Sequence, residues 1–334
     1  MDNLTHSLIG ILLSRAGLRR LTPRATLLCV AAANVPDLDI VAASKGALPY
    51  LEVHRGWTHS LVMAPLLALP PLLLVWLFVR KPEQRFGRWA GAYLASLAAV
   101  LSHDLLDWLN VYGVRLFLPL DPTWFRLDLV FIVDIWIWAL LLGGAVAPLL
   151  ARLVNAEIGA RSGPGYAGAI ATLTLLLLFI VGRGQLHEHA LATLNARRYD
   201  TSPVRRIAAF PTPANPWRWT GLVETDGEYR IFNINLLGDF DPDSARVLFK
   251  PVSNSALASA QQTASARAFL SFSQFPFWRL TPSAGGEGGT EIDLTDLRFG
   301  LPDEGRFRVS ILLDAHDRPV RESFTFGTMA RGSP

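Results

Sequence analysis

The feature that most constrains the fold is a series of apolar segments confined to the first 182 residues. Residues 60–79 read SLVMAPLLALPPLLLVWLFV and contain no ionisable side chain. A helix needs about 20 apolar residues to cross the hydrocarbon core of a bilayer. This segment therefore predicts a membrane span, kinked by Pro70 and Pro71. Three further spans are predicted at residues 89–109, 129–150 and 166–182.

Two shorter apolar runs, residues 7–16 and 24–34, precede these spans. Each is too short to cross a bilayer, so we expect a helical hairpin that enters it partway or packs under other helices. We therefore predict an α-helical polytopic membrane domain over residues 1–182.

The pattern changes after Gly182. Residues 184–199 predict an amphipathic helix, and residues 204–330 alternate apolar and polar side chains between turn sequences such as Thr225-Asp226-Gly227. The sequence predicts a helical stalk or linker over residues 183–203. A β-rich soluble domain then follows over residues 204–334, with one helix near residues 254–270.

The distribution of positive charge predicts the orientation. The formal net charge is only +3, and no basic stripe with interleaved aromatic residues suggests nucleic-acid binding, so membrane lipids are the expected partners. Most basic residues near the spans fall on one side of the membrane if the spans alternate; they are Arg15, Arg19, Arg20, Arg24, Arg80, Lys81, Arg85, Arg88, Arg152 and Arg161. The positive-inside rule makes this side cytoplasmic and the β-rich domain extracytoplasmic, in a bacterial inner membrane.

Histidines and acids lie between the apolar segments. Ionisable groups beside membrane-grade apolar sequence are costly and usually functional. Imidazole and carboxylate are the ligand types expected at a zinc-like or other transition-metal site. The candidate ligands are His6, Asp37, Asp39, His54, His59, His103 and Asp107, all on the predicted outer face. We expect one or two divalent ions, zinc first and manganese as the alternative.

Each of these residues has a plainer explanation when it is taken alone. His103 and Asp107 are spaced i,i+4 on a helix, so they can share one ion or simply form a buried hydrogen-bonded pair. Asp37 and Asp39 follow Pro36, where a helix cap or a solvated turn is common. The whole set is harder to assign to independent caps, which favours the metal site.

Two residues are candidates for direct catalytic roles. Asp39 is the best candidate for a general base or for a ligand of a second ion. Arg55 lies between His54 and His59, where it would hold an anionic group of a substrate or pair with one of the acids.

The ordered motifs resemble a known family. Thr5-His6, NVPDLD at residues 34–39, HRGWTHS at 54–60 and HDLLDWLNVYG at 103–113, followed by Pro119, are similar to the inner-membrane metal-dependent hydrolases related to YdjM. The resemblance covers about the first 180 residues. It implies a membrane-bound hydrolase with a metal site at these motifs, and it leaves the role of the C-terminal domain open.

A remoter similarity concerns the order of the ligands. His, Asp, His and then HxxxD resembles the order in the helical zinc phospholipases C, which implies His6, Asp37, His54 or His59, His103 and Asp107 as ligands. The later His and HxxxE pair of those enzymes are missing here, so one or two ions are expected instead of three.

These observations predict a membrane-bound metal-dependent hydrolase. The expected substrate is a phosphoester or ester of a lipid or lipid-linked compound at the outer membrane–water interface, attacked by a metal-activated water. A metal-binding transporter or sensor is one alternative. A non-catalytic scaffold, whose His–Asp pairs only hold helices together, is the other.

Overall fold

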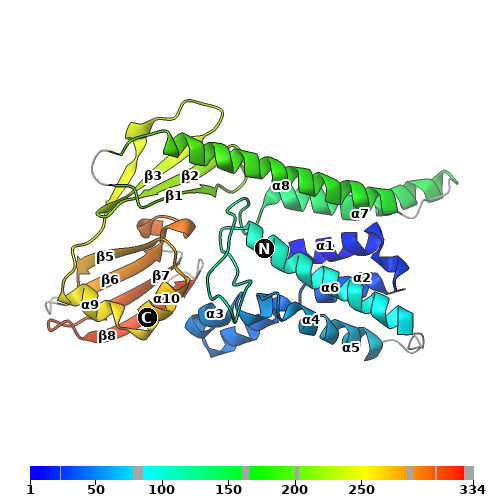
Figure 1. The fold of residues 1–334 in the computed structure, drawn as a ribbon, viewed down its shortest axis with the longest axis horizontal. Helices are drawn as coiled ribbons and strands as arrows, with labels where there is room; N and C mark the ends of the chain where they lie inside the picture. The colour runs from blue at the N-terminus through cyan, green and yellow to red at the C-terminus, as the bar shows by residue number, and fades with distance from the viewer. Residues whose placement is uncertain are drawn as a thin grey trace.

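The computed structural model describes residues 1–22, 24–77, 86–159, 165–199, 203–283, 289–304 and 307–326. Helices gather at one end of the molecule and two β-sheets at the other, as predicted (Figure 1). The longest helix, α8, runs from the helical part onto the first sheet (Figure 1).

The predicted N-terminal hairpin consists of α1 (Asn3–Ala16) and α2 (Ala25–Ala32). Asp2 caps α1 by accepting the backbone N–H groups of Leu4 and Thr5, which the helix itself leaves unpaired. The two helices pack very closely at Gly10, where a Cβ atom would lie 2.7 Å from the Cys29 carbonyl oxygen.

Short helical pieces follow the hairpin. They are the 3-10 helix η2 (Pro36–Lys45), α3 (Ala47–Val53), the 3-10 helix η3 (Trp57–His59), α4 (Ala64–Leu67) and α5 (Leu69–Leu77). The predicted single span over residues 60–79 is therefore broken within its described part. Pro70 and Pro71 lie in the first turn of α5, where proline is tolerated, so they begin a helix instead of kinking one.

The longer helices are α6 (Phe86–Leu109), α7 (Ile135–Glu157) and α8 (Tyr166–Asn195). The span predicted from residue 129 begins only at Ile135, because Asp134 accepts the N–H groups of Trp136 and Ile137 as the helix cap. Among the described helices, α7 and α8 are long and apolar enough to cross a membrane. Two bent pairs of helical segments would add one span each if each pair were a broken span. One pair is α2 with η2, and the other is the segment from α3 to η3 with the segment from α4 to α5.

Helix α8 continues through the predicted domain boundary at residue 182. The last apolar span and the predicted amphipathic helix thus form one unbroken helix, where the sequence predicted a boundary before a helical stalk or linker. Ala190 and Leu194 of α8 are buried against Trp219 and Phe232 of the first sheet. The C-terminal half of α8 is thus part of the core of the β-rich region.

The β-rich region contains two four-stranded antiparallel sheets. The first has the order β1-β2-β3-β4 (Arg206–Pro211, Arg218–Glu224, Glu228–Asn235, Arg246–Phe249). The second has the order β5-β6-β7-β8 (Pro276–Pro282, Thr290–Asp296, Phe307–Leu313, Pro319–Phe326). The predicted turn at Thr225 joins β2 to β3, with Glu224 opposite Tyr229 in the register.

Helices α9 (Ser255–Gln261) and α10 (Ala264–Phe272) replace the single helix predicted near residues 254–270. Thr263 separates them by capping α10 through the N–H of Ala266. Phe269 and Phe272 of α10 pack on Ile292 and Val309 of the second sheet. Leu51 of α3, in the helical domain, belongs to the same buried cluster.

A buried ion pair attaches the second sheet to the helical domain. Arg298 donates from Nε and Nη2 to the Asp296 carboxylate in three side-chain contacts, and both side chains are fully buried. Nη1 of Arg298 also donates to the carbonyl oxygens of Val111 and Tyr112, at 3.1 Å each, just beyond the end of α6. The position of the sheet therefore depends on the chain segment that follows α6.

We expect Asp296→Asn to lower the free energy of unfolding by roughly 3–5 kcal/mol, because it leaves the Arg298 guanidinium buried without its counter-charge. Burial alone would raise the pKa of Asp296, but Arg298 holds it below the usual value of 3.8. The stabilisation that the ionised Asp296 contributes is therefore complete above pH 3.8. It is lost as the pH falls through the lower pKa that Asp296 has in the folded state.

Denaturant unfolding of the detergent-solubilised chain, from neutral into acid pH, measures both effects. Asp303→Asn is the matched control, since Asp303 is paired with Arg246 and Arg279 at the surface and should change stability little. An Asp296→Asn variant as stable as the wild type would contradict the anchoring role of the pair.

Candidate metal centre

Five elements bring the predicted ligands together near the end of α6. Asp37 and Asp39 lie on η2, His59 on η3, His103 and Asp107 on α6, and His6 on α1; His54 ends α3. Residues that are up to a hundred positions apart in the chain thus meet in one buried place.

Four side-chain atoms form the centre of this group, which we call the four-atom cluster. They are Asp37 Oδ1, His59 Nε2, His103 Nε2 and Asp107 Oδ2. The two imidazole nitrogens are 3.0 Å apart. His59 Nε2 is 3.4 Å from each carboxylate oxygen, and His103 Nε2 is 3.6 Å from Asp37 and 3.4 Å from Asp107.

Hydrogen bonds outside the cluster fix the protonation of both imidazoles. His103 Nδ1 lies 2.7 Å from the Ala33 carbonyl oxygen, which can only accept, so Nδ1 carries the proton of the neutral ring. Thr58 Oγ1 donates to Asp39 Oδ2 at 3.1 Å, and therefore accepts from His59 Nδ1 at 3.0 Å. In both neutral rings Nε2 is left with a free lone pair.

The four-atom cluster therefore contains four acceptors and no proton between them. The 3.0 Å contact of the two Nε2 atoms is not a hydrogen bond of neutral histidines, because neither atom has a proton to donate. Four lone pairs converging in a buried site repel each other unless a cation lies among them. These four atoms are therefore suited to coordinate a metal ion.

His6 adds an imidazole beside the cluster. Its ring stacks on His103 with the centroids 3.7 Å apart, and His6 Nε2 is 3.5 Å from Asp107 Oδ1. The ring is fully buried, and neither of its nitrogens has a hydrogen-bond partner among the described residues. A buried imidazole left in this state is unusual and supports its assignment as a ligand.

Asp39 is placed beside the cluster instead of in it. Its Oδ1 accepts from His54 Nδ1 at 2.9 Å, and its Oδ2 accepts from the Arg55 backbone N–H and from Thr58, both at 3.1 Å. Asp37, Asp39 and His54 are close enough to hold an ion of their own. Such an ion would compete with these hydrogen bonds, so the geometry favours Asp39 as the residue that orients His54 and His59.

Arg55 is engaged with the protein. Its Nε is 3.1 Å from Asp107 Oδ2, and its Nη1 donates to Asn110 Oδ1 at 3.0 Å. The guanidinium lies over the Tyr112 ring, 4.6 Å from its centroid, and the residue is 3% exposed. These contacts favour compensation of Asp107 over the predicted contact with a substrate anion.

The backbone at Arg55 is also unusual. Its φ of 56° lies in the left-handed region, which costs a non-glycine residue about 1 kcal/mol. The Asp39 bond to the Arg55 N–H and the Asp107 contact of the side chain offset this cost. The HRGW turn is thus held by the acids of the site.

The sequence did not single out three residues that support the site. Thr58 connects Asp39 to His59 through its hydroxyl. Asn110 follows Asp107 by three positions and accepts from Arg55 and from the Tyr112 backbone N–H. Burial raises the pKa of the Tyr112 phenol, which keeps that ring neutral beside Arg55. Of these three residues, only Asn110 had a sequence pattern that points to the site, because it follows Asp107 at helical spacing.

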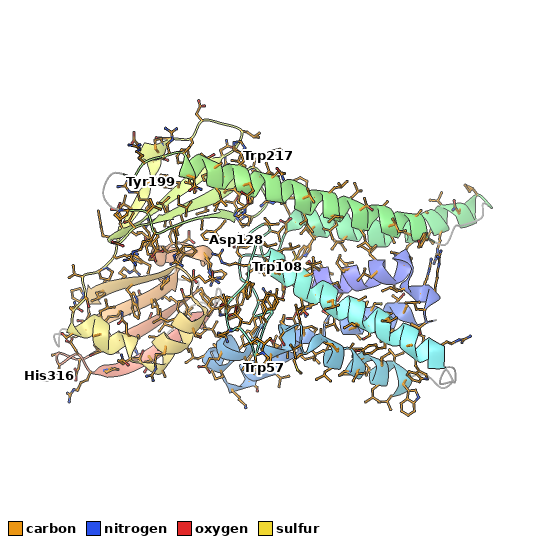
Figure 2. All side chains as sticks on the ribbon, viewed as in Figure 1. Trp57, Trp108, Asp128, Tyr199, Trp217 and His316 are labelled. Carbon is orange, nitrogen blue, oxygen red and sulfur yellow. The ribbon has the colours of Figure 1, made fainter. Side chains whose placement is uncertain are left out.

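The remaining histidines lie outside this centre. His187 Nε2 bonds the Ala209 carbonyl oxygen at 3.1 Å, where α8 meets β1. His316 lies in a turn at the far tip of the second sheet, away from the helical domain (Figure 2). Neither histidine approaches the four-atom cluster.

Residues 1–189 match the sequence model of the YdjM inner membrane protein family. The chain belongs to this family. Residues 255–328 match the YfhP C-terminal alpha/beta plait domain, which here comprises α9, α10 and the second sheet.

A full-length relative is the Bacillus subtilis (strain 168) protein named uncharacterized protein YfhP. It is 26% identical over 351 aligned positions, which cover 97% of this chain and 94% of that protein. No solved structure matches the chain. The family and the apolar helices establish a membrane protein.

We expect Arg55→Gln to lower the free energy of unfolding by about 1.5–3 kcal/mol, because the buried Asp107 would lose the guanidinium contact and retain the Met1 amino group. Arg115→Gln is the matched control, since Arg115 lies over Trp124 in the same loop region and is half-exposed. Denaturant unfolding in detergent compares the two variants. Equal stability of Arg55→Gln and wild type would show that the guanidinium does not compensate Asp107.

Proposed function

We propose that this protein is a membrane-bound zinc-dependent hydrolase that acts on a phosphoester or ester of a lipid or lipid-linked substrate. The observation that carries the proposal is the four-atom cluster, whose lone pairs have no proton among them. The family match and the motif order are consistent with it.

The spacing of the four atoms favours zinc. With zinc–nitrogen and zinc–oxygen bonds of about 2.0–2.1 Å, the ligand atoms of a tetrahedral site are about 3.3–3.4 Å apart. The five separations given above lie between 3.0 and 3.6 Å. Asp37, His59, His103 and Asp107 would hold the ion, and His6, stacked on His103, is a further candidate ligand beside them. One ion is favoured over two, because the hydrogen bonds of Asp39 compete with a second.

A cavity of about 190 Å³ adjoins the cluster and offers room for the reacting group. Asp37, Tyr50, His54 and Tyr112 line it. A bound ion would act as a Lewis acid, and it would lower the pKa of a water only if it accepted that water as a fifth ligand beside the four side chains. His54 acts as the base. Its Nδ1 proton is held by Asp39, and its Nε2 has no partner among the described residues and accepts the proton of a nucleophile in the cavity.

Apolar side chains around the site favour a lipid substrate. Leu38, Ile40 and Val41 of η2 are 60%, 60% and 69% exposed, although they flank the buried acids. Trp57, beside the short helices α3 and α4 (Figure 2), is 54% exposed. Such residues suit contact with the acyl or interfacial region of a membrane.

We place the site and the two sheets on the extracytoplasmic side of the bacterial inner membrane. This orientation is supported by Arg15, Arg19 and Arg152, which lie together around one cavity at the other end of the helical domain.

Elemental analysis of the detergent-purified full chain tests the metal site. Wild type should hold near-stoichiometric zinc, and His103→Ala should lose it while remaining folded. His189→Ala is the matched control, because His189 is exposed on α8 and should retain the metal. Release of product from phosphodiester and ester lipids in mixed micelles should follow the metal content across these variants.

If wild type holds no metal, even after incubation with zinc or manganese, the hydrolase proposal fails. His103→Ala would then be expected to unfold the domain, as a scaffold of hydrogen-bonded helices predicts. Metal binding without lipid hydrolysis would instead leave a metal-binding transporter or sensor.

The Thr58 hydroxyl offers a sharper test of how the ligands are held. Thr58→Val has nearly the same shape but cannot connect Asp39 to His59, so His59 can protonate Nε2 in place of Nδ1. We expect zinc affinity to fall by about tenfold or more. Thr58→Ser keeps the hydroxyl and should stay near wild type. Competition with a chromophoric chelator measures the affinities, and a Thr58→Val variant that binds zinc as tightly as wild type would refute the assigned tautomer.

A further inference from the structure

A second cavity lies at the end of the helical domain opposite the sheets. Its volume is about 220 Å³, and it lies between the C-terminal ends of α1 and α7 and the start of α8 (Figure 1). Arg15, Arg19 and Arg152 line it, and we call it the arginine cavity. No carboxylate is among the described residues of its lining, which also includes Thr26, Leu149 and Gly165.

The three guanidinium groups give the cavity a positive potential, which favours an anion. Arg15 is held in place by a bond from Nη1 to the Ala145 carbonyl oxygen at 2.6 Å. Thr26 Oγ1 is hydrogen-bonded to Ser14 Oγ at 2.8 Å, which fixes the α2 side of the cavity. At least part of the polar lining is therefore held in position by the surrounding helices.

The surroundings of the arginine cavity are apolar. Leu149, which lines it, is 47% exposed, and Leu150 and Leu153 on the same helix are 56% and 69% exposed. An anion bound between the arginines would therefore lie next to a surface suited to acyl chains. Basic pockets between membrane helices are the expected binding sites of acidic lipid headgroups.

We propose that the arginine cavity binds the headgroup phosphate of an anionic phospholipid, with the acyl chains along the exposed leucines of α7. Guanidinium groups match phosphate oxygens through paired N–H donors. This lipid site is distinct from the metal centre, so the proposal stands whether or not the protein is a hydrolase.

Native mass spectrometry of the detergent-purified full chain tests the proposal, with phosphatidylglycerol and phosphatidylcholine of the same acyl chains as probes. Wild type should retain phosphatidylglycerol in preference to phosphatidylcholine. Arg19→Gln/Arg152→Gln should weaken phosphatidylglycerol binding by about tenfold or more, given the contribution expected of each arginine near a membrane surface. Arg15 is left unchanged because of its bond to α7.

Two controls separate a site from general attraction. Arg24→Gln removes one charge from an exposed position near the same surface but outside the cavity, and should change binding by less than about twofold. Arg19→Lys/Arg152→Lys keeps the charge and should retain most of the binding. Thermal unfolding without added lipid should be the same for all variants.

The proposal is overturned if wild type does not distinguish the two lipids, or if the double Gln variant binds phosphatidylglycerol as wild type does. It is also overturned if Arg24→Gln has an equally large effect. Inorganic phosphate is the last probe: because the acyl chains contribute to binding, millimolar phosphate should not displace the lipid. Displacement by phosphate would identify a site for a free anion instead.

Discussion

The arrangement of the helical domain depends on the compensation of Asp107, a carboxylate buried near the end of α6. Such a charge is tolerated in an apolar interior only when cations or donors surround it. Arg55 lies against one oxygen, while the amino group of Met1 contacts the other. Arg55 reaches Asp107 on α6 from the HRGW turn, where its own backbone is left-handed. The same turn positions His54 and His59.

The same interaction extends into the C-terminal half. Asn110, which accepts from Arg55, also accepts the backbone N–H of Tyr112 and shapes the chain after α6. The carbonyl oxygens of Val111 and Tyr112 then accept from Arg298 of the plait domain. A continuous set of hydrogen bonds thus connects the candidate metal centre to the second sheet.

Different polar groups lie at the two ends of the helical domain. Acids and imidazoles gather near the sheets, together with Arg55 and the Met1 amino group, while the arginine cavity lies at the other end of the same helices. The outward surfaces of α5 and α7 expose large apolar side chains such as Leu73 and Leu142. This distribution suits a protein held in a lipid layer.

The sequence alone determined the two-part fold and indicated which ionisable side chains come together. Apolar runs can only be buried or face lipid, and ionisable side chains set among them are costly unless they find partners, so the grouping of these residues was predictable. It could not show that Asp39 orients the histidines, that α8 continues into the first sheet, or that Arg298 binds the segment after α6. Those features depend on hydrogen-bond geometry between residues far apart in the chain. Local periodicity carries no information about that geometry, and only the tertiary structure decided it.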